Sequence, residues 1–242
     1  MNGCGGNSNL SKFEVKLNSH GFTRALPVTT FWISYGKLAN LYNRYLLPRL
    51  INLAMSHEEA ARLRAVHIPR ARGVVLEAGI GSGLNIPFYT SAVTKLYGID
   101  PSAELLALAR DNAAAASFPI ELIRGSAERV PLPDESIDTV VITWSLCSIH
   151  DPAAALSEMR RVLRPGGALI FVEHGLSSDP HVRKWQNRLT PFWRPCAGGC
   201  HLNRKIDDLV RDAGFAINDL RCEYVPGPRP LTFMYQGRAE KI

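Results

Sequence analysis

The sequence predicts an α/β protein whose parallel sheet is covered by helices on both faces. Between residues 74 and 173, short apolar runs alternate with helical patterns, which is typical of strand–helix–strand units. Glycines follow the first of these runs and an aspartate ends the second, and ligands of such sheets bind at these strand ends. A chain of 242 residues, 46% of them hydrophobic, suits one such domain and an additional segment.

The expected elements follow in chain order. Residues 26–55 carry aromatic and aliphatic side chains at helical spacings, with Pro48 expected to kink or restart the helix, and a second helix capped by Ser56 is expected over 57–66. Strands are expected over 74–76, 95–99, 120–123, 139–143 and 168–173, with helices over 103–116 and 152–163. A helix over 203–213, capped by Asn203 and stopped by Gly214, then precedes two strands, 215–224 and 231–238.

The last two strands must run antiparallel, because only the short turn around Gly227 joins them. The segment 180–201 is rich in Trp, Arg, Pro and Gly, and no element is assigned to it. The charge of +6 is spread along the chain without a Lys/Arg run, so no nucleic-acid partner is expected.

The cysteines indicate the compartment. They are five in number and scattered, so a disulfide framework is not expected and a reducing cytoplasm is predicted. The N-terminus shows no secretory signal, and no apolar stretch there reaches the about 20 residues of a spanning helix.

Three alternate glycines, Gly79, Gly81 and Gly83, follow the carboxylate of Glu77 at the end of the first strand. Glycines permit unusual φ values and close approach of a ligand, and a helix expected next would offer free N–H groups. Asp100 ends the second strand, where an acid can accept hydrogen bonds from both hydroxyls of a ribose. The pattern predicts an adenosine-containing ligand, and Glu77 is placed to meet a cationic group rather than a pyrophosphate.

The motifs between Val74 and Phe171 resemble those of the class I S-adenosylmethionine-dependent methyltransferases (methyltransferase type 11 group). Residues 77–83 look like the first motif of that family, 125–133 like its adenine-binding loop, and 136–141 and 161–167 like two further signatures. The resemblance implies a Rossmann-like seven-stranded sheet with the last strand antiparallel, and S-adenosylmethionine as cofactor.

The resemblance also implies the cofactor-binding residues. Ser126 departs from the Asp of many members, so Glu128 or a backbone carbonyl is the alternative acceptor for the adenine amino group, with Ala127 contributing its N–H. Tyr42 and Tyr45 are expected to cover the cofactor, with ordinary core packing as the alternative. The full set is Glu77, Gly79, Gly81, Gly83, Asn85, Asp100, Pro101, Ser126, Ala127, Glu128, Thr143, Trp144, Tyr42 and Tyr45. Residues 1–70 are expected to form an N-terminal helical lid, and residues 71–242 the cofactor-binding domain.

A narrower resemblance concerns the methyl acceptor. Residues 143–149, 172–174 and 185–204 are similar to the alkyl-thiol methyltransferases of the methyltransferase-like seven group and their bacterial relatives. This implies a small-molecule thiol or sulfide acceptor, with Trp185, Trp193 and Cys200 as substrate-binding residues. The alternatives are N- or O-methylation of a lipid head group or metabolite, and a non-enzymatic cofactor-binding module. Members of that group have a membrane-associated N-terminus, and membrane attachment is not expected for this chain on that basis. Peripheral membrane contact and the oligomeric state are left open.

Two histidines are candidates for the catalytic base. His174 ends the fifth strand and His150 follows the fourth, and either could accept a proton near neutral pH, with a structural histidine as the alternative for each. Cys196, Cys200 and His201 lack a fourth suitably spaced ligand, so no metal is expected. Cys147 is expected to be a small buried hydrophobe.

Overall fold

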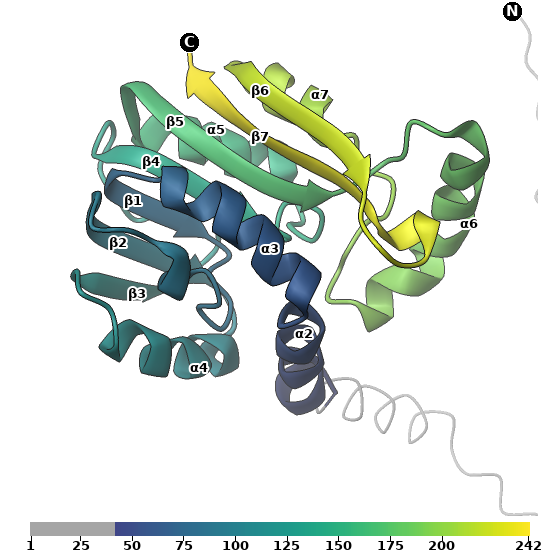
Figure 1. The fold of residues 1–242 in the computed structure, drawn as a ribbon, viewed down its shortest axis with the longest axis horizontal. Coiled ribbons are helices and arrows are strands. Elements are labelled where there is room, and N and C mark those ends of the chain that lie inside the picture. The colour runs from purple at the N-terminus through teal and green to yellow at the C-terminus, as the bar shows by residue number, and fades with distance from the viewer. Residues whose placement is uncertain (1–41) are drawn as a thin grey trace, which may run out of the picture. The chain divides into compact units, whose positions relative to one another are not determined.

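A seven-stranded sheet with the order β3-β2-β1-β4-β5-β7-β6 organises the computed structural model, which describes residues 42–242 (Figure 1). The first five strands pair in parallel, and β7 is antiparallel to both β5 and β6. The predicted fold class, including the antiparallel last strand, is therefore confirmed. The strands are β1 (Gly73–Ala78), β2 (Val93–Asp100), β3 (Ile120–Arg124), β4 (Ile137–Thr143), β5 (Leu163–His174), β6 (Phe215–Tyr224) and β7 (Phe233–Lys241).

Helices cover both faces of the sheet. Side chains of α5 and α7 pack with the sheet in one apolar cluster, and those of η2, η3 and α4 pack in a second. Figure 1 shows α3 crossing in front of the sheet while α5 lies behind it. The helices are η1 (Tyr42–Leu46), α2 (Leu47–Met55), α3 (Glu58–His67), η2 (Ile68–Arg70), η3 (Ile86–Phe88), α4 (Ala103–Ala114), α5 (Pro152–Val162), α6 (Pro180–Cys196), α7 (Ile206–Asp212) and η4 (Arg229–Leu231).

The helix boundaries near the N-terminus follow from Pro48, which lies in the first turn of α2, where a missing N–H costs no helical bond. The expected restart at Pro48 is confirmed, while residues 26–41 of the expected helix lie outside the described residues. The predicted cap of α3 is wrong, because His57 occupies the cap position and the Ser56 hydroxyl donates to the Asn52 carbonyl at 2.6 Å. The predicted Asn203 cap is wrong as well, since α7 begins only after Lys205.

Two segments differ from the sequence prediction in kind. The helix expected after the glycine turn is only the single 3-10 turn η3. The segment 180–201, for which no element was predicted, contains α6. The cap residue of this helix, Asp179, accepts a hydrogen bond from the His181 amide at 2.8 Å. The buried Gln186 anchors this helix by donating to the carbonyls of Gly175 and Pro230 at 3.0 and 3.1 Å.

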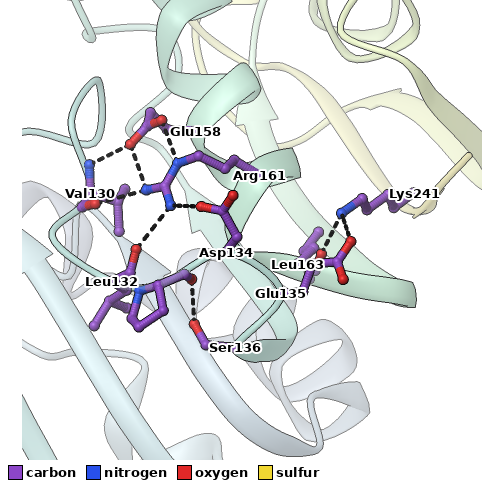
Figure 2. A network of polar contacts seen from close by, with 10 residues as sticks. Val130, Leu132, Asp134, Glu135, Ser136, Glu158, Arg161, Leu163 and Lys241 are labelled. Atoms are coloured by element: carbon purple, nitrogen blue, oxygen red, sulfur yellow. Dashed lines mark hydrogen bonds and ion pairs between the residues drawn. The ribbon is translucent and has the colours of Figure 1, made fainter.

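The loop between β3 and β4 is held to α5 by Arg161 (Figure 2). Its guanidinium donates to the Val130 and Leu132 carbonyls and pairs with Glu158 at 2.7 Å and Asp134 at 2.6 Å. Hydrogen bonds from Arg161 to these two acids raise the pKa of the guanidinium above its ordinary value. This contact gives the 161–167 signature a structural role, because it fixes the loop that the resemblance assigns to adenine.

Among the helices within residues 42–242, none combines the length and the apolar character needed to cross a membrane.

Candidate cofactor and acceptor sites

Two adjoining cavities lie at the carboxyl ends of the central strands. The first cavity, of about 300 Å³, is lined by the ends of β1, β2 and β4, and the second, of about 430 Å³, by the end of β5 together with α2, α3 and the C-terminal loops. Both volumes lie in the range of small-molecule sites. The residues common to both walls are Ile51, Met55, Trp144, Ser148 and Ala197.

The glycine turn forms one wall of the first cavity. Gly79, Gly81 and Gly83 have φ values of +76°, +55° and +78°, which L side chains rarely adopt. A Cβ atom on Gly81 would meet nothing within 4 Å, whereas one on Gly83 would lie 3.2 Å from Ala109 of α4. Gly79 and Gly81 line the cavity, while Gly83 permits close helix packing instead. The open space over Gly81 is what a closely approaching ligand requires.

Asp100 is buried and lies against this turn. One carboxylate oxygen accepts from the Gly81 amide at 3.0 Å and the other from the Ser102 amide at 2.8 Å. Burial raises the pKa of Asp100, and the two amide hydrogen bonds oppose the shift. Each oxygen keeps a further lone pair, so the carboxylate fits the expected ribose hydroxyls.

Glu77 is the buried acid of the first cavity. Its carboxylate accepts from Asn85 Nδ2 and from the Tyr89 hydroxyl, both at 2.8 Å. Burial raises the pKa of Glu77 to about 8, against the opposing effects of these two donors and of Arg64. A cationic ligand would stabilise the ionised form, because it would compensate the charge where water does not.

Arg64 is a cavity residue that sequence reasoning missed. It is only 5% exposed, donates from Nε to Asn85 Oδ1 at 2.9 Å and lies 4.9 Å from the centre of the Trp144 ring. Burial lowers the pKa of Arg64 to about 10. Trp144 itself has φ of +48°, a backbone conformation that occurs at functional sites in non-glycine residues. Thr143, just before it, accepts a hydrogen bond from Asn85 at 2.9 Å.

The wall nearest the N-terminus comes from α2. Ile51 and Met55 line both cavities, and Asn52 lines the first and accepts from the Ser82 hydroxyl at 2.6 Å. Tyr42 lies apart from both walls and donates to the Cys196 carbonyl at 2.7 Å. Tyr45 is exposed and lines neither cavity. In the described part of the chain, the N-terminal segment therefore reaches the site through α2 and α3.

The loop after β3 lies outside the walls of the first cavity. Ser126 and Glu128 hydrogen-bond each other at 3.0 Å, and Ala127 is part of the apolar core. Pro101, by contrast, lines the cavity beside Asp100. The adenine role of residues 126–128 stays a prediction.

The second cavity brings together three of the predicted site residues, His174, Cys200 and Trp193, and also Cys147. His174 is 6% exposed, its Nδ1 lies 3.7 Å from Cys200 Sγ, and its Nε2 has no hydrogen-bond partner among the described residues. The Sγ atoms of Cys147 and Cys200 are 3.6 Å apart. Hydrogen bonding between these thiols lowers the pKa of Cys200 and raises that of Cys147.

Glu173 fixes the loop that carries Cys147. Its buried carboxylate accepts from the amides of Ser145, Leu146 and Cys147 at 2.8, 2.9 and 3.2 Å. Burial raises the pKa of Glu173 to about 7, and these amides oppose the shift. Sequence reasoning did not assign this role, although Glu173 directly precedes the strand-end histidine in the sequence.

Other predicted residues lie apart from the second cavity. His150 is exposed and lines neither cavity, and Trp185 is 56% exposed beside Arg188 on the outer side of α6. Cys196 and His201 are likewise absent from both described walls.

Comparison with known proteins agrees with this geometry. Residues 76–171, which contain the glycine turn, Asp100 and Thr143, match the family described as "Methyltransferase domain". This segment is a methyltransferase domain. A SAM-dependent methyltransferase structure from Methanosarcina mazei shares the fold of the domain, with a TM-score of 0.54 and 22% identity over 70% of this chain and 92% of that one.

Two curated relatives of the methyltransferase domain differ in their acceptors. The thiol S-methyltransferase TMT1B of Rattus norvegicus is 34% identical over 160 residues, 64% of each chain. A phosphatidylethanolamine N-methyltransferase of Cereibacter sphaeroides is 39% identical over 119 residues, 48% of this chain and 58% of that one. The chain thus spans less than two thirds of the length of either relative.

Proposed function

We propose that the protein transfers the methyl group of S-adenosylmethionine to the sulfur of a small-molecule thiol or sulfide. The observation that carries this proposal is the second cavity, which shares a wall with the first and is lined by sulfur, imidazole and apolar groups. A donor in one cavity and an acceptor in the other would meet at the shared wall formed by Trp144, Met55 and Ser148.

In the proposed reaction the cofactor supplies a methyl group already activated by its sulfonium sulfur. Asp100 holds the ribose, the open backbone at Gly81 admits the cofactor, and Glu77 compensates a cationic group. The protein then has to align donor and acceptor and exclude water. Ile51, Met55 and Trp144 provide apolar surface at the junction of the cavities.

Removal of the acceptor proton is assigned to the end of β5. A thiol attacks as its thiolate, so a group that takes or displaces the proton accelerates the step. His174 lines the second cavity, and its buried Nε2 has no hydrogen-bond partner among the described residues, which supports this assignment. The exposed His150 lacks such a position.

A lipid head group is the second candidate, and one observation disfavours it. A phosphate-bearing head group is normally held by Lys or Arg. The wall of the second cavity, as far as residues 42–242 form it, contains neither. The apolar members of this wall, including Ala54, Leu63, Leu202, Val225 and Met234, suit an uncharged alkyl thiol.

We also propose that residues 1–70 act as a helical lid over the domain formed by residues 71–242. The support comes from α2, whose Ile51, Asn52 and Met55 contribute to the cavity walls, and from Arg64 of α3.

An acceptor panel tests the proposed function. The full chain is incubated with methyl-labelled S-adenosylmethionine and matched alkyl thiols, sulfide, amines and phenols, and labelled products are identified by mass spectrometry. The proposal expects labelled thioethers, and a much lower yield with Asp100→Ala. Label only on amines or phenols would favour the second candidate. Cofactor binding without any labelled product would favour a non-enzymatic module.

A further inference from the structure

The thiols of Cys147 and Cys200 and the imidazole of His174 form a cluster of soft donors in the wall of the second cavity. One ligand atom from each side chain lies within 4.8 Å of the others. The two sulfurs are 3.6 Å apart, and Cys200 Sγ lies 3.7 Å from His174 Nδ1. In a tetrahedral zinc site, with Zn–S of about 2.3 Å and Zn–N of about 2.0–2.1 Å, neighbouring donor atoms lie about 3.5–3.8 Å apart. These two separations match that spacing, and the third pair of donors lies within 4.8 Å.

The backbone holds these donors in place. The three amide hydrogen bonds to Glu173 fix the loop of Cys147. The His201 amide donates to the Cys147 carbonyl at 2.8 Å, which ties the segment of Cys200 to the same loop. Such positioning before binding is what a metal site on rigid elements requires.

A second observation concerns the His174 ring, which is buried. Its Nδ1 lies 3.7 Å from Cys200 Sγ and is the nitrogen that would bind the ion, whereas Nε2 has no hydrogen-bond partner within the described residues. An unpartnered polar atom in the interior is costly, so buried imidazoles normally hydrogen-bond or ligate a metal. His174 and both cysteines line the second cavity, so a bound ion would be accessible from it.

We propose that Cys147, His174 and Cys200 bind a thiophilic divalent metal ion, with zinc as the best fit, and leave its fourth position open to the second cavity. Within the described residues, no further His, Cys, Asp or Glu belongs to this group. Two Cys, one His and an open position form a known type of catalytic zinc site. The sequence did not indicate the site, because its donors come from three separate segments of the chain.

This inference rests on the proposed function and specifies how the acceptor would be activated. A thiol that enters the fourth position loses its proton to water and binds as thiolate. Its sulfur then forms a bond to the methyl carbon while the bond to the cofactor sulfonium breaks. That electron pair stays on the cofactor sulfur, giving S-adenosylhomocysteine, and the neutral thioether leaves the metal. His174 would thus promote proton loss as a ligand of the ion.

Cobalt(II) provides a direct probe of the site. The full chain is reduced with a thiol-free reductant and titrated with cobalt(II), and absorption from thiolate-to-cobalt charge transfer and from tetrahedral cobalt is recorded. Zinc affinity is then measured by competition with a chromophoric chelator. We expect one ion per chain, bound with the absorption of two thiolates in tetrahedral geometry.

Matched variants locate the ion. Cys200→Ser and His174→Gln should each weaken zinc binding at least about tenfold. Cys196→Ser and His201→Gln, neighbours in sequence that lie outside the cluster, should bind like the natural protein. Circular dichroism identifies any variant that has unfolded, and the remaining cluster variant then decides the result.

The inference is overturned if the reduced protein shows no charge-transfer band, or if the cluster variants bind as tightly as the controls. It is also overturned if Cys147 and Cys200 form a disulfide with each other and bind no metal ion after reduction. If the metal-free protein methylates thiols at full rate, the metal has no part in the reaction, and the proposed function still stands. If the protein binds zinc but transfers no methyl group to any acceptor, the metal site stands and the proposed function is refuted.

Discussion

The amide of Asn85 donates to the buried carboxylate of Glu77 at 2.8 Å and thereby joins the loop after β1 to the acid of the first cavity. The charged and titratable groups around this acid are Arg64, Tyr89 and Asp100. Burial, to which the negative charge of Asp100 adds, outweighs the opposing effects of Tyr89, Asn85 and Arg64 and raises the pKa of Glu77 to about 8. Glu77 is therefore mostly neutral at pH 6 and becomes ionised as the pH approaches 8.

This shift predicts a pH dependence of cofactor binding. A cationic cofactor binds better to the ionised acid, so its affinity should rise between pH 6 and pH 8, by at most about tenfold per pH unit. Glu77→Gln should remove most of that rise. Isothermal titration calorimetry with S-adenosylmethionine at several pH values measures it. If the cofactor affinity of Glu77→Gln rises with pH as steeply as that of the unmodified protein, another group causes the pH dependence.

Asp100 should contribute directly to cofactor affinity. Asp100→Ala removes an acceptor for two ribose hydroxyls, and hydrogen bonds to charged groups contribute about 1.5–3 kcal/mol each, so affinity should fall at least about tenfold. Because Asp100 also accepts from two amides, thermal melting must show that the variant is folded. Unchanged affinity in a folded variant would remove Asp100 from the cofactor site.

The role of α2 can be tested without truncating the chain. Ile51 lines both cavities, whereas Leu53 on the same helix is 72% exposed and lines neither. Ile51→Ala should lower kcat/KM several-fold by loosening the shared wall, and Leu53→Ala should leave it unchanged. Equal effects of the two substitutions would argue against α2 as part of a lid. Removing residues 1–55 should leave the sheet folded and reduce turnover strongly.

His174 should affect turnover more than cofactor binding. A proton-removing group is worth about 10²–10⁴-fold in rate, so His174→Ala should lower turnover while cofactor affinity changes little. With an alkyl thiol acceptor, the loss should shrink as the pH rises beyond the thiol pKa, for which the cysteine value of about 8.5 is a guide.

The exposed His150 provides the control for this prediction, since His150→Ala should retain full activity. A loss in His174→Ala that stays constant at all pH values would indicate a structural histidine. Unchanged turnover of His174→Ala at neutral pH would exclude His174 from the mechanism.

The parts of the site that sequence reasoning found are those set by local patterns. Gly79 and Gly81 lie in the turn after β1, and Asp100 ends β2, so their place at one sheet edge follows from parallel topology. Arg64 escaped this reasoning because its partner Asn85 is 21 positions away and on another element. Cys147 and Cys200 lie 53 positions apart and meet only through the fold.

The missed helix α6 has a different cause. Pro191 and Pro195 lie inside it and argued against a helix, although Asp179 and Pro180 form a recognisable start. Packing outweighs the prolines here, because the buried Gln186 bonds two backbone carbonyls outside the helix. Local propensity thus failed where tertiary contacts decided the structure.

The most direct test of the account is a crystal structure of the full chain with S-adenosylhomocysteine and a small alkyl thiol. The account predicts the ribose hydroxyls on Asp100, the homocysteine sulfur at the wall shared by the two cavities, and the thiol sulfur beside His174 and Cys200. A thiol bound elsewhere, or a cofactor product that makes no contact with Asp100, would contradict it.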